Sequence, residues 1–109
     1  MDFKKGNIYV TAPMPADGSE FSEDLLRNEN FTLERIISEG QTTPEGEWYD
    51  QATDEWVILL QGEASVEFAD SGIVKLSQGD YLWIPAHSLH RVMRTSKKPH
   101  CVWLALHAK

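Results

Sequence analysis

Two histidines lie in a segment that reads GDYLWIPAHSLHRV and spans residues 79–92. His87 and His90 follow Pro85, and proline has no N–H to donate to a sheet, so we expect the chain to leave the preceding strand there as a loop. Imidazole is the commonest metal ligand in proteins and titrates near neutral pH. The pair therefore predicts metal binding or proton transfer, and a solvent-facing pair without function is the alternative.

The composition indicates one globular domain with an acidic surface. The chain has 109 residues, of which 41% are hydrophobic and 25% charged, enough for a single core. Its 17 acidic and 10 basic residues give a net charge of −7. Nucleic acid is not expected as a partner, because its binding depends mainly on clustered Lys and Arg that neutralise phosphates. The single cysteine, Cys101, excludes an internal disulfide and a Cys-rich zinc site and is expected to be buried.

The hydrophobic segments are short. The longest strongly apolar run, residues 56–60, cannot span a bilayer, and the first ten residues lack the apolar stretch of a signal peptide. We therefore expect a cytoplasmic protein with no membrane partner.

Most of the chain after Asn30 has the alternating pattern of β-strands separated by turn residues. Strands are predicted within residues 31–39, 55–61, 64–70, 72–76, 81–84, 90–95 and 100–107, with residues 55–70 forming a hairpin that turns at Gly62. Residues 6–10 predict a further short strand. Ser19 is a suitable N-cap for a short helix over residues 20–27, whose first half is acidic. The pattern predicts an all-β antiparallel sandwich or barrel with one short N-terminal helix.

Two spacings within these strands resemble the cupin family. Cupins carry the motifs G-x5-H-x-H-x3/4-E-x6-G and G-x5-P-x-G-x2-H-x3-N. Residues 49–62 contain Y-x-Q-x3-E-x6-G, and residues 79–90 contain G-x5-P-x-H-x2-H. The resemblance covers about residues 31–108 and implies a single cupin domain over residues 1–109. Its jelly-roll β-barrel would occupy residues 31–108, after a short strand and helix in residues 1–30.

The resemblance also implies which residues form the site. It places Glu55 and His90 where cupins have the glutamate and the last histidine of a metal site. Tyr49 and Gln51 stand at the two histidine positions of the first motif, and His87 replaces the glycine of the second. This departure from the family pattern concerns the expected metal ligands themselves.

The chemistry of these residues allows a divalent metal but does not require one. On an extended strand Tyr49 and Gln51 share a face and can look into one cavity. Gln51, Glu55 and His90 would then hold Fe, Mn, Zn or Ni, with His87 as an alternative ligand beside His90. A neutral amide and a protonated phenol are weaker donors than the two imidazoles they replace. In the alternative, Glu55 and His90 hydrogen-bond each other with no metal.

One further histidine, His107, stands near the end of the chain. It either lines the barrel mouth or is a solvated terminal residue, and we expect the latter.

Two functions follow from this pattern. The first is a metal-dependent enzyme that acts on a small organic substrate, an oxygenase, decarboxylase or isomerase as the resemblance implies, with Tyr49 as a catalytic acid–base or orienting hydroxyl. The second is a metal-free binding module for a small molecule. A homodimer is also predicted, from four tryptophans, apolar strands and the family resemblance.

Overall fold

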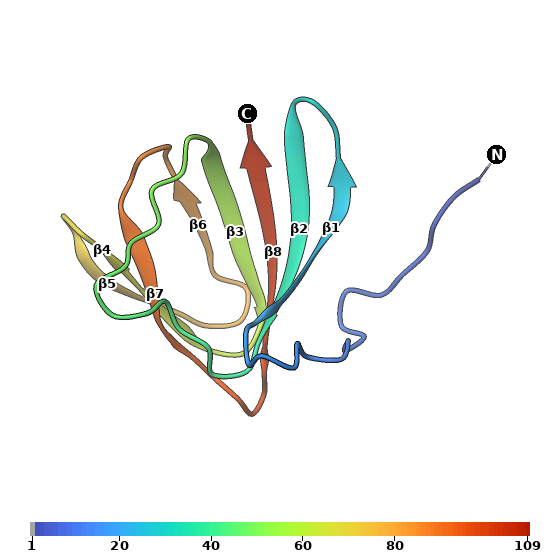
Figure 1. The fold of residues 1–109 in the computed structure, drawn as a ribbon, viewed down its shortest axis with the longest axis horizontal. Coiled ribbons are helices and arrows are strands. Elements are labelled where there is room, and N and C mark those ends of the chain that lie inside the picture. Colours follow the sequence, from blue (N-terminus) through green and yellow to red (C-terminus); the bar gives the residue numbers. More distant parts are fainter. Residues whose placement is uncertain (1) are drawn as a thin grey trace.

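A computed structural model describes residues 2–109, which fold into two antiparallel β-sheets that face each other (Figure 1). The strands are β1 (Phe21–Arg27), β2 (Phe31–Ser38), β3 (Asp54–Gln61), β4 (Ala64–Phe68), β5 (Gly72–Leu76), β6 (Tyr81–Ile84), β7 (His90–Thr95) and β8 (Cys101–Ala108). One sheet has the order β1-β2-β8-β3-β6 and the other β5-β4-β7. No ladder between these strands joins the two sheets. The all-β antiparallel class is confirmed, as an open two-sheet structure rather than a closed barrel.

The predicted N-terminal helix is wrong. Residues 21–27 form β1, which pairs with β2 in a register running from Phe21 opposite Ile37 to Arg27 opposite Thr32. The ladder with β2 gives the backbone N–H and C=O groups of β1 hydrogen-bond partners. This tertiary contact outweighs the local preference of the acidic residues in β1 for the start of a helix. No helix occurs in the part of the chain that the structure describes, and therefore none there could cross a membrane.

The short strand predicted over residues 6–10 is also wrong. These residues form a turn in which the Val10 N–H donates to the Asn7 carbonyl at 3.1 Å. The guanidinium of Arg35, on β2, donates to the carbonyl oxygens of Ile8 and Val10 at 3.2 and 2.6 Å. The segment is therefore held by a side chain on the sheet and not by a ladder.

The β3–β4 hairpin is wrong as well, although both strands were located. β3 pairs with β6 and β8, whereas β4 pairs with β5 and β7, so the chain passes from one sheet to the other at Gly62. Gly62 has φ +96°, and a Cβ there would lie 2.9 Å from both Cys101 Sγ and Ser96 Oγ. This position is a crowded corner that only glycine fits.

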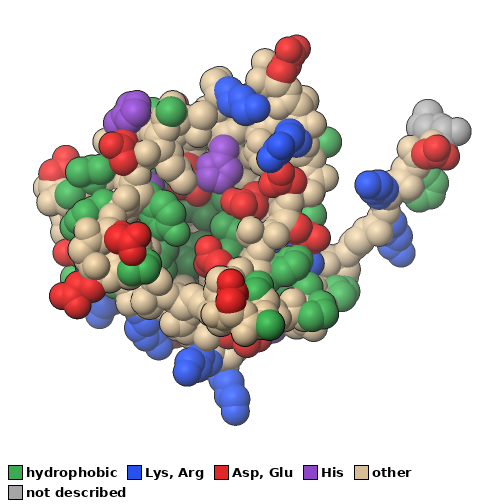
Figure 2. Space-filling model, viewed as in Figure 1, with side chains coloured by type: hydrophobic (Ala, Val, Ile, Leu, Met, Phe, Trp, Pro, Cys, Tyr) green, Lys and Arg blue, Asp and Glu red, His purple; other side chains and the backbone are tan. Residues whose placement is uncertain are grey.

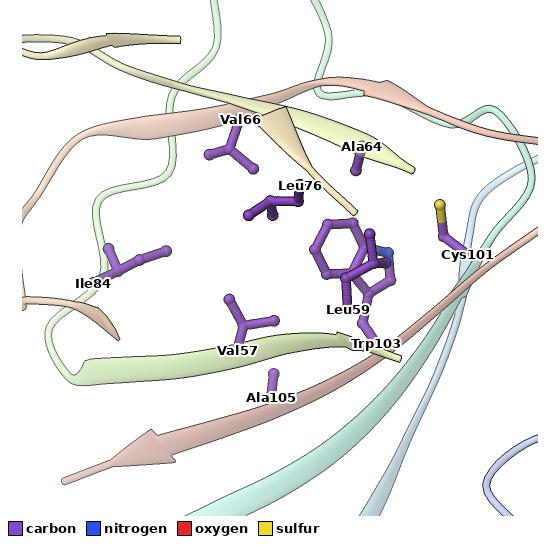
Figure 3. Close-up of a cluster of buried hydrophobic side chains, with 9 residues drawn as sticks. All are labelled: Val57, Leu59, Ala64, Val66, Leu76, Ile84, Cys101, Trp103 and Ala105. Carbon is purple, nitrogen blue, oxygen red and sulfur yellow. The ribbon is translucent and has the colours of Figure 1, made fainter. Parts of the chain in front are cut away.

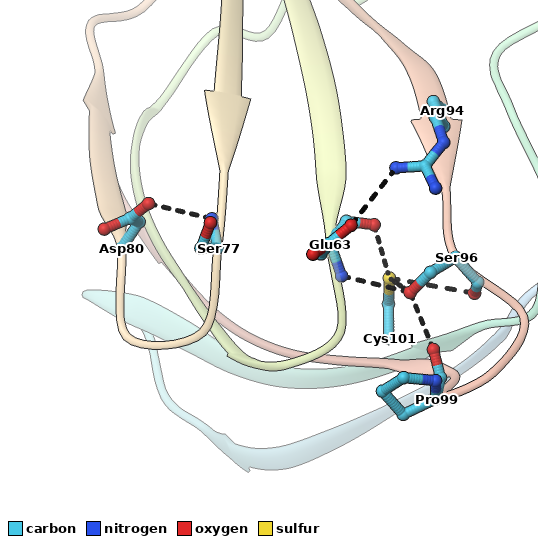
Figure 4. Close-up of polar contacts among 7 residues, drawn as sticks. All are labelled: Glu63, Ser77, Asp80, Arg94, Ser96, Pro99 and Cys101. Atoms are coloured by element: carbon cyan, nitrogen blue, oxygen red, sulfur yellow. Dashed lines mark hydrogen bonds and ion pairs between the residues drawn. The ribbon is translucent and has the colours of Figure 1, made fainter.

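Hydrogen bonds around the corner close one end of the molecule (Figure 4). The Glu63 N–H donates to Ser96 Oγ at 3.0 Å, and the Ser96 hydroxyl donates to the Pro99 carbonyl at 2.6 Å. The Cys101 thiol donates to the Glu63 carbonyl at 3.3 Å. Cys101 is fully buried, as predicted.

The hydrophobic core fills the space between the sheets next to this corner (Figure 3). Its members alternate along the inner faces of the strands: Val57, Leu59, Ala64, Val66, Leu76, Ile84, Cys101, Trp103 and Ala105. β3 runs toward the corner, so its first residues, and the last residues of the antiparallel β8, lie at the opposite end. Polar side chains occupy the inner face there.

The outer face of the five-stranded sheet carries exposed aromatic residues. Tyr81 and Trp83 of β6 are 63% and 64% exposed and lie opposite Ile58 and Trp56 of β3. The rings of Trp56 and Tyr81 are 5.4 Å apart. Within one chain this face is only partly covered.

Candidate functional site

A cavity of about 370 Å³ lies between the two sheets. Figure 2 shows acidic and histidine side chains around a hollow whose depth is hydrophobic. The lining combines carboxylates, imidazoles, small polar groups and apolar side chains. It consists of Glu20, Ser22, Glu34, Ile36, Ser38, Tyr49, Gln51, Glu55, Val57, Val66, Leu82, Ile84, His90, Val92, Trp103 and His107.

Glu55 lies between two imidazoles. It is the second residue of β3 and faces His107 across the ladder with β8, while His90 comes from β7 in the other sheet. Glu55 Oε1 lies 3.7 Å from His90 Nε2, and Glu55 Oε2 lies 3.8 Å from His107 Nε2. Both Glu55 and His90 are buried, with exposed fractions of 8% and 5%. A buried carboxylate is thus paired through both of its oxygens.

The orientation of His90 is fixed by the backbone. Its Nδ1 donates to the Ser88 carbonyl at 2.8 Å, which leaves Nε2 facing Glu55. Burial disfavours the charged imidazole, but the Glu55 carboxylate and the Ser88 carbonyl outweigh it and raise the pKa of His90 above 6.5.

His107 lies in the cavity and is not a solvated terminal residue. Its Nε2 is 3.2 Å from Glu34 Oε1, and its side chain is 22% exposed. The hydrogen bond with Glu34 raises the pKa of His107 above 6.5, against the opposing effect of burial. The signal was present in the sequence, since inward positions in β8 recur at every second residue from Cys101 and reach His107.

Tyr49 and Gln51 both line the cavity, as their expected shared face predicts. The segment that carries them is fixed to β7: the Tyr49 N–H donates to the His90 carbonyl at 2.7 Å, and the His90 N–H donates to the Tyr49 carbonyl at 3.3 Å. Burial, with the charge of Glu20, raises the pKa of the Tyr49 phenol above 10.0. A phenol is a hydrogen-bond donor at neutral pH. Gln51 Oε1 is buried without a hydrogen-bond partner.

His87 lies on the rim and does not line the cavity. Its side chain is 68% exposed, and Nδ1 is 2.7 Å from Asp50 Oδ1. His87 has φ +63°, a left-handed backbone conformation that glycine adopts most readily. The glycine that cupins have at this position therefore suits the backbone observed here.

Glu20 is a cavity residue that the sequence did not indicate, because it was assigned to a helix. It precedes β1, and its Oε2 accepts a hydrogen bond from the Ser38 hydroxyl at 3.1 Å. Ser38 Oγ in turn accepts one from Trp103 Nε1 at 3.2 Å. Burial raises the pKa of the Glu20 carboxyl above 4.5, against the effect of the Ser38 bond.

Known proteins share this architecture. The cupin domain model matches residues 35–107. A protein from Ralstonia eutropha JMP134, provisionally named a mannose-6-phosphate isomerase, is 40% identical with a TM-score of 0.89, over 97% of this chain and 98% of that one. A cupin superfamily protein from Desulfitobacterium hafniense DCB-2 is 18% identical with a TM-score of 0.76, over 99% and 94% of the two chains, which shows the fold alone.

No curated protein matches the chain. The family model covers well over half of the chain. The chain therefore belongs to the cupin family.

Proposed function

We propose that the cavity binds a small polar organic molecule and transfers a proton on it, with Glu55 as the acid–base group. One observation carries this proposal: each oxygen of Glu55 faces an imidazole nitrogen, of His90 at 3.7 Å and of His107 at 3.8 Å. A carboxylate flanked by two titratable imidazoles is suited to take a proton from a substrate and return it. The cavity volume of about 370 Å³ suits a molecule of monosaccharide size.

Other lining residues supply substrate orientation. The Tyr49 phenol, which is protonated at neutral pH, donates a hydrogen bond to a substrate oxygen. The buried Gln51 Oε1 has no protein donor and accepts one from the substrate. Together they would hold the substrate against Glu55.

The provisional name of the Ralstonia eutropha protein supports the same class of reaction. Interconversion of an aldose and a ketose moves a proton between neighbouring carbon atoms, and it needs one group that accepts and returns that proton. Glu55 meets this requirement with its two imidazole partners. For the present chain we propose only this class of proton transfer, and not the substrate in the name of the Ralstonia eutropha protein.

A divalent metal is the second candidate, and Gln51 favours it. Among residues 2–109 no three His, Cys, Asp or Glu side chains are grouped to hold a metal. The orphaned amide oxygen of Gln51 is a further donor outside that set, so Glu55, His90 and Gln51 would hold the ion. A bound cation would polarise a substrate carbonyl or hydroxyl as a Lewis acid.

Solvent exchange tests the proton transfer directly. The protein is incubated with mannose or mannosamine in D₂O, and exchange of the proton on the carbon next to the carbonyl is followed by NMR. We expect Glu55→Gln to slow exchange by about a hundredfold or more, because the general base is lost. Glu29→Gln, which removes the same charge from an exposed turn, is the control and should leave the rate unchanged. Exchange that persists in Glu55→Gln contradicts the proposal.

Chelation separates the two candidates. If the exchange rate survives removal of divalent ions, and elemental analysis finds no bound metal, the acid–base reading stands without metal. If the rate is lost on chelation and restored by one divalent ion, the ion held by Glu55, His90 and Gln51 becomes part of the mechanism.

A further inference from the structure

We infer that the cavity takes a small organic molecule with an ammonium group, which pairs with Glu20, and that it rejects phosphate esters. The inference rests on the proposed function of this cavity and names the charge of its ligand. Four features of the lining support it: the charge of the cavity, the lack of an ionic partner for Glu20, the unpartnered acceptor of Gln51, and the aromatic ring of Tyr49.

The charged groups of the lining are three carboxylates and two imidazoles, with no Lys or Arg. Glu34 and Glu55 are paired with the imidazoles of His90 and His107. Even with both imidazoles charged, one carboxylate is left without compensation. The cavity is therefore negative, as is the chain with its net charge of −7, and it attracts a cation.

Glu20 is the uncompensated carboxylate. No Lys, Arg or His of the described chain forms an ion pair with Glu20, whose bond in the structure is the neutral hydroxyl of Ser38. As a whole residue Glu20 is exposed to solvent, but partial desolvation of its carboxyl and the nearby charge of Glu34 disfavour the ionised form, against the Ser38 hydrogen bond. An ammonium at this position would reduce that cost, because the charged carboxylate would then have a partner.

The lining also holds a buried hydrogen-bond acceptor that has no donor in the protein. Ser38 uses its hydroxyl proton on Glu20 and accepts from Trp103. The buried Gln51 Oε1 accepts nothing from the protein. This second, independent observation at another part of the cavity calls for a ligand that donates N–H or O–H groups. An ammonium has donors only, whereas a phosphate dianion has acceptors only.

Tyr49 is a further lining residue that can attract a cation. Its ring lines the cavity together with Glu20, and both residues also line an adjoining hollow of about 650 Å³. A carboxylate and an aromatic ring that line the same cavity both attract an ammonium.

A phosphate finds no comparable partner. Helix N-termini and Arg or Lys side chains are the usual phosphate sites, and residues 2–109 contain no helix. Lys97 lines the adjoining hollow, together with Glu20 and Glu39, and does not line the cavity. A phosphate ester in the cavity would meet three carboxylates.

Three sugars that differ in charge test the inference. Binding of mannosamine, mannose and mannose 6-phosphate is measured by calorimetry for the wild type, for Glu20→Gln, and for the control Glu29→Gln. We expect mannosamine to bind about tenfold more tightly than mannose, and mannose 6-phosphate to bind more weakly than either. Glu20→Gln should abolish the advantage of mannosamine over mannose, while Glu29→Gln should leave that advantage and mannose binding unchanged.

The outcomes separate this inference from the proposed function. If mannose 6-phosphate binds as tightly as mannosamine, or if the advantage of mannosamine survives in Glu20→Gln, the ammonium inference is overturned and the cavity still binds a small molecule. If none of the three sugars binds, the ammonium inference is overturned. If they also show no proton exchange, the proposed function fails as well. Melting curves of Glu20→Gln confirm that the variant is folded.

Discussion

Glu55 and His107 face each other across neighbouring strands, with 3.8 Å between Glu55 Oε2 and His107 Nε2. The contact brings the last inward residue of β8 into the same cavity as His90, which lies in the other sheet. His107 is thereby a counterpart of His90, and the two imidazoles act on opposite oxygens of one carboxylate.

This relationship predicts that His90 and His107 contribute about equally to the rate of proton exchange. We expect His107→Gln and His90→Gln each to slow proton exchange on the substrate by about tenfold or more, because each removes one proton partner of Glu55. His87→Gln, on the rim, is the control and should leave the rate unchanged. If the His107→Gln variant keeps the wild-type rate, His107 takes no part in the proton transfer. The NMR exchange assay described above measures all three.

Glu20 predicts a specific dependence of stability on pH. Its folded-state pKa is raised above 4.5 by burial, so the folded protein favours the protonated form. Stability from this group is present below pH 4.5 and is lost as pH rises through the raised pKa. At neutral pH, where Glu20 is charged, Glu20→Gln should therefore have a higher free energy of unfolding than the wild type. In acid, where Glu20 is protonated, this difference should be smaller. Urea unfolding on both sides of the transition measures this, and an equal gain at both pH values would contradict it.

Gly62 predicts a large effect of a single methyl group. Gly62→Ala should lower the free energy of unfolding by about 3 kcal/mol, because its Cβ would meet Cys101 and Ser96 and because its φ is positive. Gly72→Ala has the same kind of φ, +89°, with no atom within 4 Å, and should cost about 1 kcal/mol. The difference between the variants in urea unfolding isolates the crowding at the corner. Equal losses of unfolding free energy in the two variants would show that the positive φ, and not the crowding, causes the destabilisation.

The backbone of His87 predicts a difference between two substitutions. Both His87→Gly and His87→Ala lose the exposed pair with Asp50, but only glycine relieves the conformation at φ +63°. We expect the glycine variant to be more stable than the alanine variant by about 1 kcal/mol. Thermal or urea unfolding compares them. An alanine variant as stable as the glycine variant would mean that the backbone relaxes without cost.

The homodimer stays a prediction, and the exposed outer face of the five-stranded sheet is the interface that we expect. Trp83 and Tyr81 are exposed on that face, next to Trp56, and burying them would stabilise an association. We expect light scattering at micromolar concentration to give a dimeric mass, and Trp83→Lys to shift it toward the monomer. Trp48→Lys changes an exposed tryptophan that packs near Arg91 instead, and serves as the control. A monomeric wild type would refute the prediction.

The sequence by itself determined the fold class and most of the strands after Asn30. The period-two alternation, broken by turn residues, locates strands such as Phe31–Ser38 and Tyr81–Ile84, because that period reports which residues face the core. Motif spacing likewise selected Glu55 and His90, which lie together in the cavity. These features depend on local order along the chain, which a sequence records directly.

Only the tertiary structure decided how the strands pair and which distant residues meet. Residues 21–27 have a helix-compatible composition, and it is the ladder with β2 that makes them a strand. Gly62 resembles a hairpin turn, but contacts with Ser96 and Cys101 make it a corner between sheets. Glu20 and His107 join the cavity through β1 and β8, at opposite ends of the chain. Such long-range pairing depends on packing free energy shared by both sheets, which local patterns do not contain.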